Sequence, residues 1–305
     1  MEKHGAPLIG RSSRLPAGDG VSLAVESRGA NDAPPILFAH GFGQSRHAWT
    51  RTAESLAALG WRTVTFDARG HGDSDRLADG RYALEQFVDD LLMMARSLRT
   101  PPVLVGASMG GLLGLVAAGE TRPDPFGALV LVDITPRWET AGVERMLGFM
   151  RAHPQGFASL DEAAEEVAAY LPQRRRRKDR YELAQLLRCG EDGRLRWHWD
   201  PALLDTVGHE GERHQQRLLN AARNIDVPTL LVSGGRSDIV SEATVKEFLD
   251  MVPHATHVEI PHATHTLAGD DNAAFTAAIE SFLNTLDPDV VPAPQTHAVG
   301  LRGLP

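Results

Sequence analysis

Short runs of apolar, often β-branched residues recur along the chain, at 36–39, 63–66, 103–105, 128–132, 229–233 and 257–260. Such runs are typical of strands that are covered on both faces of a parallel sheet. Helices are predicted at 51–59, 85–98 and 272–283, the last two from apolar residues spaced to form one face. The order of strands and helices predicts an α/β fold with a mainly parallel sheet and right-handed connections.

Two stretches depart from this pattern. Residues 8–29 alternate in polarity and turn at Gly18 to Gly20, which predicts an opening antiparallel hairpin with its second strand at about 21–26. Residues 135–224 offer helical segments rich in Arg, Glu and Ala, with no strand of comparable quality. We therefore expect a core domain made of residues 1–134 and 225–288, a helical insertion at 135–224, and a Pro-rich tail at 289–305 that is poorly ordered or lies on another surface.

Composition narrows the class of protein. The formal net charge of −9 argues against a nucleic-acid binder, and the single cysteine, Cys189, excludes an intrachain disulfide and a cysteine-based metal site. The N-terminus lacks a hydrophobic signal core, and no run approaches the ~18 apolar residues of a membrane span. We expect a cytoplasmic protein with no membrane partner, and the choice between monomer and homodimer stays open. The basic run from Arg174 to Lys178 is interpreted as a solvated helix face, with binding of an acidic group as the alternative.

Candidate chemistry starts at Ser108, which follows the strand at 103–105, precedes an apolar helix, and stands between Gly106 and Gly110 in a GxSxG pattern. The GxSxG pattern alone also occurs in plain glycine-rich turns, so the evidence for a nucleophile is the strand before it and the helix after it. A strand that turns sharply into a helix exposes the serine hydroxyl, and the helix N-terminus offers N–H groups to a developing oxyanion. The stretch therefore predicts a nucleophilic serine.

An acid and a base are available at other strand ends. A serine hydroxyl needs a base to take its proton, and a histidine base needs a third group to orient it. Asp238 lies just beyond the strand at 229–233, and His265 lies just beyond the strand at 257–260. Both fall beyond the carboxyl ends of strands, where α/β sheets bind ligands.

From about residue 20 to 285 the chain resembles the α/β-hydrolase superfamily, through HGFG at 40–43, DARGHGDSD at 67–75, GASMGG at 106–111, GGRSD at 234–238 and HATH at 262–265. The resemblance implies a mainly parallel eight-stranded sheet flanked by helices, with residues 135–224 as a helical lid. It also implies Ser108 as nucleophile, His265 as general base and Asp238 as its orienting acid. The oxyanion hole would be formed by the backbone N–H groups of Met109 and Phe42.

Alternatives to these roles exist in the sequence. Asp133 ends the strand after the nucleophile helix, and some members of the superfamily take their acid from that position. His262 is an alternative base. His40 and His71 lie in the oxyanion loop and in a glycine-rich turn, and we interpret both as structural.

A serine at position 108, where epoxide hydrolases and haloalkane dehalogenases of this fold carry an aspartate, favours acyl transfer through an acyl-enzyme. We expect hydrolysis of a small apolar carboxylic ester or lactone, with no metal and no organic cofactor. The same residues could instead support a C–C bond hydrolase of vinylogous diketones, a cofactor-free perhydrolase, an acyltransferase, or a ligand-binding scaffold without catalysis.

The lid is expected to determine which substrates reach Ser108, through large apolar side chains around the site. Besides Phe42 and Met109, the candidates for the substrate pocket are Trp138, Met146, Phe149, Met150, Tyr170, Trp197 and Trp199.

Overall fold

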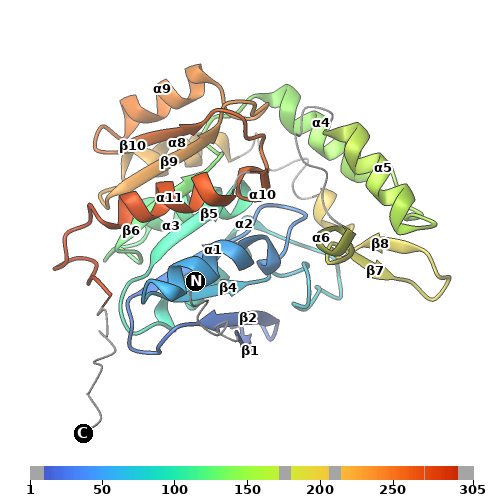
Figure 1. The fold of residues 1–305 in the computed structure, drawn as a ribbon, viewed down its shortest axis with the longest axis horizontal. Coiled ribbons are helices and arrows are strands. Elements are labelled where there is room, and N and C mark those ends of the chain that lie inside the picture. The colour runs from blue at the N-terminus through green and yellow to red at the C-terminus, as the bar shows by residue number, and fades with distance from the viewer. Residues whose placement is uncertain (1–9, 172–179, 206–213, 271, 295–305) are drawn as a thin grey trace, which may run out of the picture.

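An eight-stranded sheet forms the centre of the computed structural model, which describes residues 10–171, 180–205, 214–270 and 272–294 (Figure 1). Across the sheet the order is β1-β2-β4-β3-β5-β6-β9-β10. The strands are β1 (Arg11–Pro16), β2 (Ser22–Arg28), β3 (Pro35–Ala39), β4 (Arg62–Phe66), β5 (Val103–Ala107), β6 (Ala128–Val132), β9 (Thr229–Gly234) and β10 (Thr256–Ile260).

The pairing is antiparallel only where β2 meets β1 and β4, and it is parallel from β4 to β10. This confirms the predicted α/β fold with a mostly parallel sheet. The apolar runs behave as expected of strands covered on both faces. Leu104 and Leu129 pack into the core on one face, and Val103, Val105 and Val130 pack into the core on the other.

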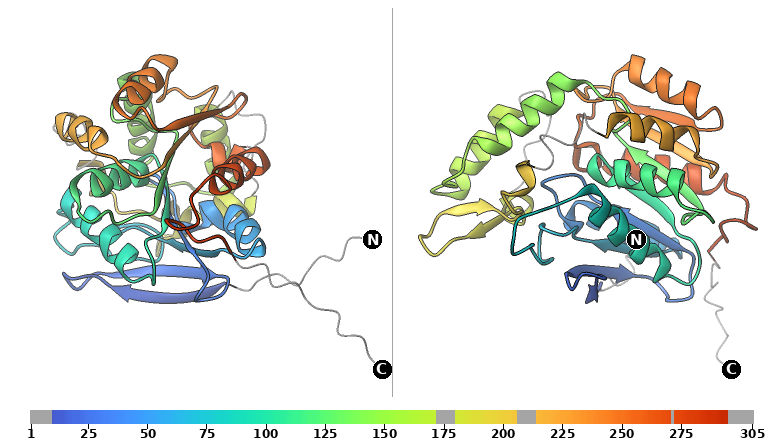
Figure 2. Two further views of the ribbon diagram at one scale, coloured as in Figure 1. Left: turned by 90° about the vertical axis from the view of Figure 1, so that its left-hand side faces the viewer. Right: turned by 180° about the vertical axis from the view of Figure 1, so that it is seen from behind.

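Helices cover both faces of the sheet (Figures 1 and 2). One layer contains α1 (Thr50–Ala58) and α11 (Asn272–Leu283), which contact each other. The other contains α2 (Leu84–Arg96), α3 (Met109–Glu120), α8 (Gln215–Arg223) and α9 (Glu242–Met251). Two short helices, η1 (Arg46–Trp49) and α10 (Leu267–Asp270), lie near the carboxyl ends of the strands and line one cavity there. Because the strands from β4 to β10 are parallel, their carboxyl ends all lie at this edge of the sheet.

A cap projects from that edge, at the right of Figure 1. It contains α4 (Thr140–Arg151), α5 (Leu160–Tyr170), α6 (Arg180–Ala184) and a hairpin of β7 (Leu187–Cys189) and β8 (Leu195–Trp197). The hairpin departs from the expectation of helices alone. Its strands are three residues each, too short for the sequence pattern to distinguish them from a loop. They are held by a small apolar core around Phe157 and Leu183.

Helix α8 falls inside the predicted insertion at 135–224, yet it packs on α3 of the core. A Cβ added to Gly119 would lie 2.2 Å from the backbone oxygen of Ala221, so the two helices approach more closely than a larger residue allows. The run from Arg174 to Lys178 lies outside the described residues.

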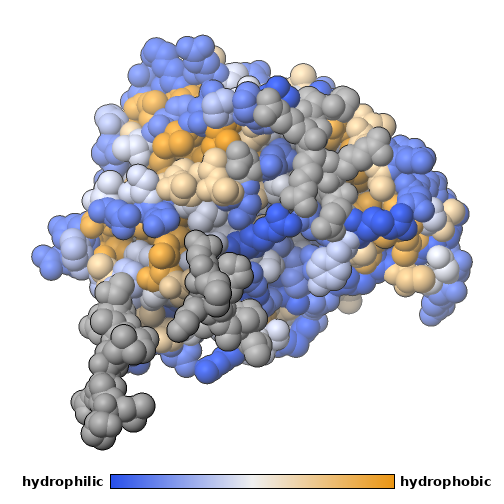
Figure 3. All heavy atoms as spheres, viewed as in Figure 1, coloured by the Kyte–Doolittle hydropathy of each residue, from blue (hydrophilic) through white to orange (hydrophobic). Residues whose placement is uncertain are grey.

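Hydrophilic residues dominate the face drawn in Figure 3, and apolar residues reach it in separate patches. Among the described residues, no helix is both long enough and apolar enough to cross a membrane. The predicted tail at 289–305 is described as far as residue 294, and within that part Val291 is buried.

Candidate active site

Ser108 occupies the turn between β5 and α3 in a backbone conformation that L-residues rarely adopt, with φ 45° and ψ −114°. The flanking glycines make this turn possible. A Cβ on Gly106 would lie 2.6 Å from the backbone oxygen of Gly110, and one on Gly110 would lie 2.3 Å from the backbone oxygen of Ala39. Both distances are shorter than real Cβ contacts, so the GxSxG pattern follows from the packing of α3 against β3 and β5. A strained serine at a strand-to-helix corner is the geometry of an exposed nucleophile.

His265 lies in the loop after β10 and contacts Asp133. Its Nδ1 lies 2.7 Å from Asp133 Oδ2, with the histidine side chain 15% exposed and the aspartate fully buried. Asp133 directly follows β6 with φ 50°, and it also accepts hydrogen bonds from Gly234 N–H (2.8 Å) and Ser237 Oγ–H (2.5 Å). These donors fix the carboxylate, so that Oδ2 is directed at the imidazole.

The structure corrects the expectation that Asp238 orients the histidine. Asp238 forms an ion pair with Arg145 of α4, which connects the core to the cap. The loop after β9 contributes Ser237 to Asp133, while Asp238 is directed to the cap. Asp133, the alternative acid in the sequence, makes the contact with His265 instead. His262, the alternative base, is exposed, and His265 makes the contact with Asp133.

Ser108 lies next to this pair. Its N–H donates to the oxygen of Val132, the residue before Asp133 (3.1 Å). In the described residues the Ser108 hydroxyl and the His265 imidazole make no direct hydrogen bond. Catalytic hydrogen bonds are often long in enzymes without substrate and shorten in the complex. The three side chains come from neighbouring parts of one sheet edge, which is the arrangement that a triad requires.

The backbone N–H groups of Phe42 and Met109 have no hydrogen-bond partner in the described part of the chain. Met109 is the first residue of α3, so its N–H lacks an acceptor within the helix. Both residues line the same cavity as Ser108. Two donors beside Ser108, one of them at a helix N-terminus, suit a developing negative charge on oxygen.

Buried imidazoles hold the Phe42 loop in position. His40 Nδ1–H donates to the oxygen of Gly41 (2.9 Å), and its Nε2 accepts from Ala68 N–H (2.9 Å). His71 Nε2 accepts from Gly43 N–H at 3.3 Å. Burial lowers the pKa of both histidines, and that of His71 falls well below its ordinary value. Both are therefore neutral acceptors near neutral pH, as expected for structural residues.

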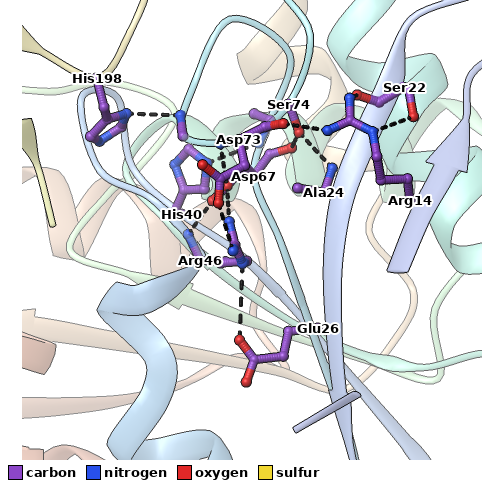
Figure 4. Close-up of polar contacts among 12 residues, drawn as sticks. Arg14, Ser22, Ala24, Glu26, His40, Arg46, Asp67, Asp73, Ser74 and His198 are labelled. Carbon is purple, nitrogen blue, oxygen red and sulfur yellow. Dashed lines mark hydrogen bonds and ion pairs between the residues drawn. The ribbon is translucent and has the colours of Figure 1, made fainter. Parts of the chain in front are cut away.

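The turn at 67–75 carries His71 and is connected to the cap. Gly72 N–H donates to Nδ1 of His198, which comes from the segment after β8 (2.8 Å; Figure 4). Within the turn, Asp67 accepts from Arg46 N–H (2.7 Å) and Asp73 N–H (2.9 Å). Burial lowers the pKa of His198 to about 3. The cap, the turn and the loop that carries Phe42 therefore form one hydrogen-bonded unit.

A mostly apolar cavity of about 250 Å³ opens beside Ser108. Four of the predicted pocket residues line it, namely Phe42, Met109, Trp138 and Met146. Sequence reasoning missed the remaining wall, which includes Leu84, Phe87, Leu112, Leu147, Leu218 and Ile239. These side chains come from α2, α3, α4, α8 and the loop after β9, and only their packing in three dimensions brings them together.

The other predicted pocket residues have different contacts. Phe149 stacks on Tyr170 at 4.3 Å between ring centroids and meets Trp197 edge-on at 5.9 Å, so these three belong to the aromatic packing of the cap. Trp199 packs on Phe42 at 5.5 Å. A Cβ on Gly43 would lie 3.6 Å from Trp199 Nε1 and would collide with the end of Met150. Met150 and Trp199 therefore contact the loop that carries Phe42, outside the cavity.

Among the described residues, no group of three or more His, Cys, Asp or Glu side chains is arranged to hold a metal ion.

Comparison with known proteins gives concordant matches. The family model described as "alpha/beta hydrolase fold" matches residues 34–271. The "sn-1-specific diacylglycerol lipase ABHD11" of Mus musculus is 30% identical over 265 residues, covering 82% of this chain and 81% of the relative. The "3-hydroxybutyrate-oligomer hydrolase" of Cupriavidus necator is 28% identical over 261 residues, covering 81% and 87%.

Two solved structures of hydrolases are also similar to this chain in fold. The structure of E-2-(acetamidomethylene)succinate hydrolase superposes with a TM-score of 0.78 at 25% identity, covering 91% of this chain and all of that one. The esterase Rv0045c of Mycobacterium tuberculosis superposes with a TM-score of 0.68 at 25% identity, covering 92% and 93%.

Proposed function

The chain belongs to the α/β-hydrolase family, and on that premise we propose that it is a serine hydrolase that cleaves a carboxylic ester or lactone through an acyl-enzyme. The catalytic triad is Ser108, His265 and Asp133. The observation that carries this proposal is the contact of 2.7 Å between His265 Nδ1 and the buried Asp133 carboxylate. This contact leaves His265 Nε2 as the nitrogen that can take a proton from a serine.

In the first half of the reaction, Ser108 Oγ attacks the substrate carbonyl carbon and His265 Nε2 takes the hydroxyl proton. Asp133 stabilises the imidazolium that forms. The carbonyl oxygen becomes an oxyanion, which accepts hydrogen bonds from Phe42 N–H and Met109 N–H. The bond from carbonyl carbon to leaving oxygen then breaks, and His265 returns the proton to that oxygen. Water, deprotonated by the same histidine, attacks the carbonyl carbon of the acyl-enzyme. The bond from that carbon to Ser108 Oγ then breaks, His265 returns the proton to Oγ, and the acid is released.

The cavity beside Ser108 supports the proposed substrate class. Its wall beside Ser108 is largely apolar, which favours a small or medium apolar acyl group. Relatives named as a lipase, an esterase and an oligomer hydrolase agree with an ester substrate.

Hydrolysis of p-nitrophenyl butyrate by the wild type and by Ser108→Ala tests the proposal. We expect turnover by the wild type and its loss in the variant. A folded wild type that hydrolyses neither simple esters nor lactones would overturn the proposal. Cleavage of a vinylogous diketone instead of esters would identify a C–C bond hydrolase, and no reaction with any of these substrates would favour a binding scaffold.

A further inference from the structure

The proposed oxyanion donor Phe42 lies in a tight turn that runs from Gly41 to Gln44. Gln44 N–H donates to the oxygen of Gly41 at 3.0 Å, and Gly43 has φ 73°, a value that favours glycine. Phe42 is the second residue of this turn, so the hydrogen bond that closes the turn does not use its N–H. The direction of that N–H therefore depends on how the turn is held on each side.

The core domain holds one side of the turn. The oxygen of Gly41 and the N–H of Phe42 belong to one planar peptide group and point in opposite directions. His40 Nδ1–H donates to this oxygen at 2.9 Å, and His71 Nε2 accepts from Gly43 N–H at 3.3 Å. Both bonds hold the backbone of the turn from the core.

Two side chains of the cap contact the same turn. Trp199, from the segment after β8, packs on the Phe42 ring with 5.5 Å between the ring centroids, and both residues are buried. A Cβ placed on Gly43 would lie 3.6 Å from Trp199 Nε1 and would collide with the end of Met150, which belongs to α4. The turn is therefore enclosed between the histidines of the core and the cap.

Trp199 is itself held in place through its neighbours in the sequence. Asp200 N–H donates to the oxygen of Gly70 at 2.7 Å, which connects this segment to the core. Arg76 Nη2–H donates to the oxygen of His198 at 3.0 Å. Neither bond involves the indole, so replacing the Trp199 side chain leaves both of them in place. The indole is thus a fixed surface for the turn.

We propose, resting on the hydrolase function above, that Trp199 is a positioning residue of the oxyanion hole and that Met150 assists it. Packing against the indole fixes the Phe42 ring, and with it the direction in which Phe42 N–H points toward the substrate oxygen. Hydrogen bonds weaken steeply when donor and acceptor are misaligned, and oxyanion donors act because they are oriented before the charge forms. The cap thereby takes part in stabilising the transition state.

Trp199 and Met150 do not line the apolar cavity beside Ser108, so their substitution should leave substrate binding nearly unchanged. In each half of the reaction the carbonyl oxygen becomes an oxyanion, so formation and breakdown of the acyl-enzyme should slow together. A lower kcat at an unchanged KM is the result expected when an interaction made only in the transition state is weakened.

The first measurement is kcat and KM for p-nitrophenyl butyrate in Trp199→Leu, Trp199→Phe and Met150→Ala. Deleting one oxyanion donor costs about 10²–10³-fold in kcat, and a donor that is only displaced should cost less. We expect kcat to fall about ten- to thirtyfold in Trp199→Leu and about three- to tenfold in Met150→Ala, with KM within about twofold. Trp199→Phe keeps an aromatic ring against Phe42, so its kcat should stay within about threefold of the wild type.

A second measurement observes the oxyanion itself. The probe is a butyl trifluoromethyl ketone labelled with carbon-13 at its carbonyl, to which Ser108 Oγ adds while the hydroxyl proton passes to His265. The adduct has no leaving group, so it persists, and the carbon-13 shift reports whether its oxygen is ionised. In Trp199→Leu this oxygen should ionise about one pH unit higher than in the wild type, which corresponds to about tenfold weaker stabilisation. A side chain that only stabilised the fold of the cap would not change this titration.

Phe157→Leu is the matched control. Phe157 is a buried aromatic residue of the cap that lies edge-on to Trp197 at 5.2 Å and packs with Leu183. Its described contacts lie within the cap, so kcat and KM should stay within about twofold of the wild type and the ionisation of the adduct should not shift. Circular dichroism confirms the folding of each variant. If Trp199→Leu does not fold, Met150→Ala decides the question, because Met150 is only partly buried, and an unchanged kcat there would refute the proposal.

The remaining results have distinct meanings. If Trp199→Leu folds and leaves both kcat and the ionisation of the adduct unchanged, the positioning role is wrong while the hydrolase function stands. The same conclusion follows if Phe157→Leu lowers kcat as much as Trp199→Leu does, because loosening of the cap then explains both losses. A rise in KM alone would place Trp199 in substrate binding and would also overturn the proposal. If the folded wild type hydrolyses no ester and forms no adduct with the ketone, the proposed function itself fails.

Discussion

Asp133→Asn is the substitution that separates the two candidate acids. In the native site Gly234 N–H donates to Asp133 Oδ1, while His265 and Ser237 contact Oδ2. Gly234 N–H cannot accept a hydrogen bond, so an asparagine must keep its oxygen at the Oδ1 position. Its NH₂ group then faces His265 and requires Nδ1 to be an acceptor. The proton moves to Nε2, and the histidine can no longer take the serine proton.

The magnitude follows from this wrong tautomer. Loss of the acid of a serine triad lowers kcat by about 10⁴-fold, or about 5.5 kcal/mol of activation free energy. Asp238→Asn removes an ion pair with Arg145 whose side chains are 24% and 50% exposed. Such a pair contributes about 1 kcal/mol or less, so kcat should fall by less than about tenfold.

The assay is kcat for p-nitrophenyl butyrate in the wild type, Asp133→Asn and Asp238→Asn, with circular dichroism to confirm folding. The ratio of the two losses is the informative quantity. A large loss in Asp238→Asn together with a small loss in Asp133→Asn would refute the assignment.

Three further predictions concern the framework of the site. Burial lowers the pKa of His71 and lowers that of His198 to about 3, whereas a histidine in the unfolded chain has a pKa of about 6.5. Below about pH 6.5 the unfolded chain therefore binds more protons than the folded chain. The free energy of unfolding should therefore be unaffected by these groups above about pH 6.5 and should fall as the pH is lowered from there; a urea titration that shows no loss between pH 6.5 and 4 would contradict this. Asp90→Ala removes two hydrogen bonds of 2.7 Å from the buried Arg69, which keeps its ion pair with Asp19, and should lower the free energy of unfolding by about 1.5–3 kcal/mol, whereas a loss below about 1 kcal/mol would refute the role of this pair. Gly110→Ala introduces a Cβ 2.3 Å from a backbone oxygen of β3 and should destabilise the fold by about 1–3 kcal/mol in the same assay, and unchanged stability would argue against this close packing.

The sheet could be predicted because each strand is marked by residues that are adjacent in the sequence. A strand covered on both faces needs a continuous apolar run, and a strand-to-helix corner needs small residues on either side of the serine. The runs at 128–132 and 229–233 therefore correspond closely to β6 and β9, and Ser108 lies at the predicted turn. The hairpin of β7 and β8 lacked such a signal, because each strand is short and only partly buried.

The acid could not be assigned in the same way, because Asp133 and Asp238 both follow strands that are neighbours in the sheet. The choice depends on the path of the loop after β9, which directs Ser237 to Asp133 and Asp238 to Arg145. Arg145 lies on a helix of the cap, far away in the sequence. A local signal does exist, since Asp133 directly follows its strand whereas Asp238 is separated from the end of β9 at Gly234 by three residues.

The pocket depended even more on tertiary packing. Trp138 and Met146 line the apolar cavity, but Phe149 and Trp197 pack against each other within the cap. In the sequence all four are large apolar residues of the same insertion. Only the packing of α4 against α5 and the hairpin determines which of them lie beside Ser108.

Covalent labelling with a fluorophosphonate, followed by peptide mapping, tests the central claim most directly. This reagent traps a serine that has been activated by a neighbouring base. The account predicts a single adduct on Ser108, with labelling that slows strongly in Asp133→Asn and hardly changes in Asp238→Asn. An unlabelled folded protein, an adduct on another residue, or the opposite ranking of the two variants would contradict it.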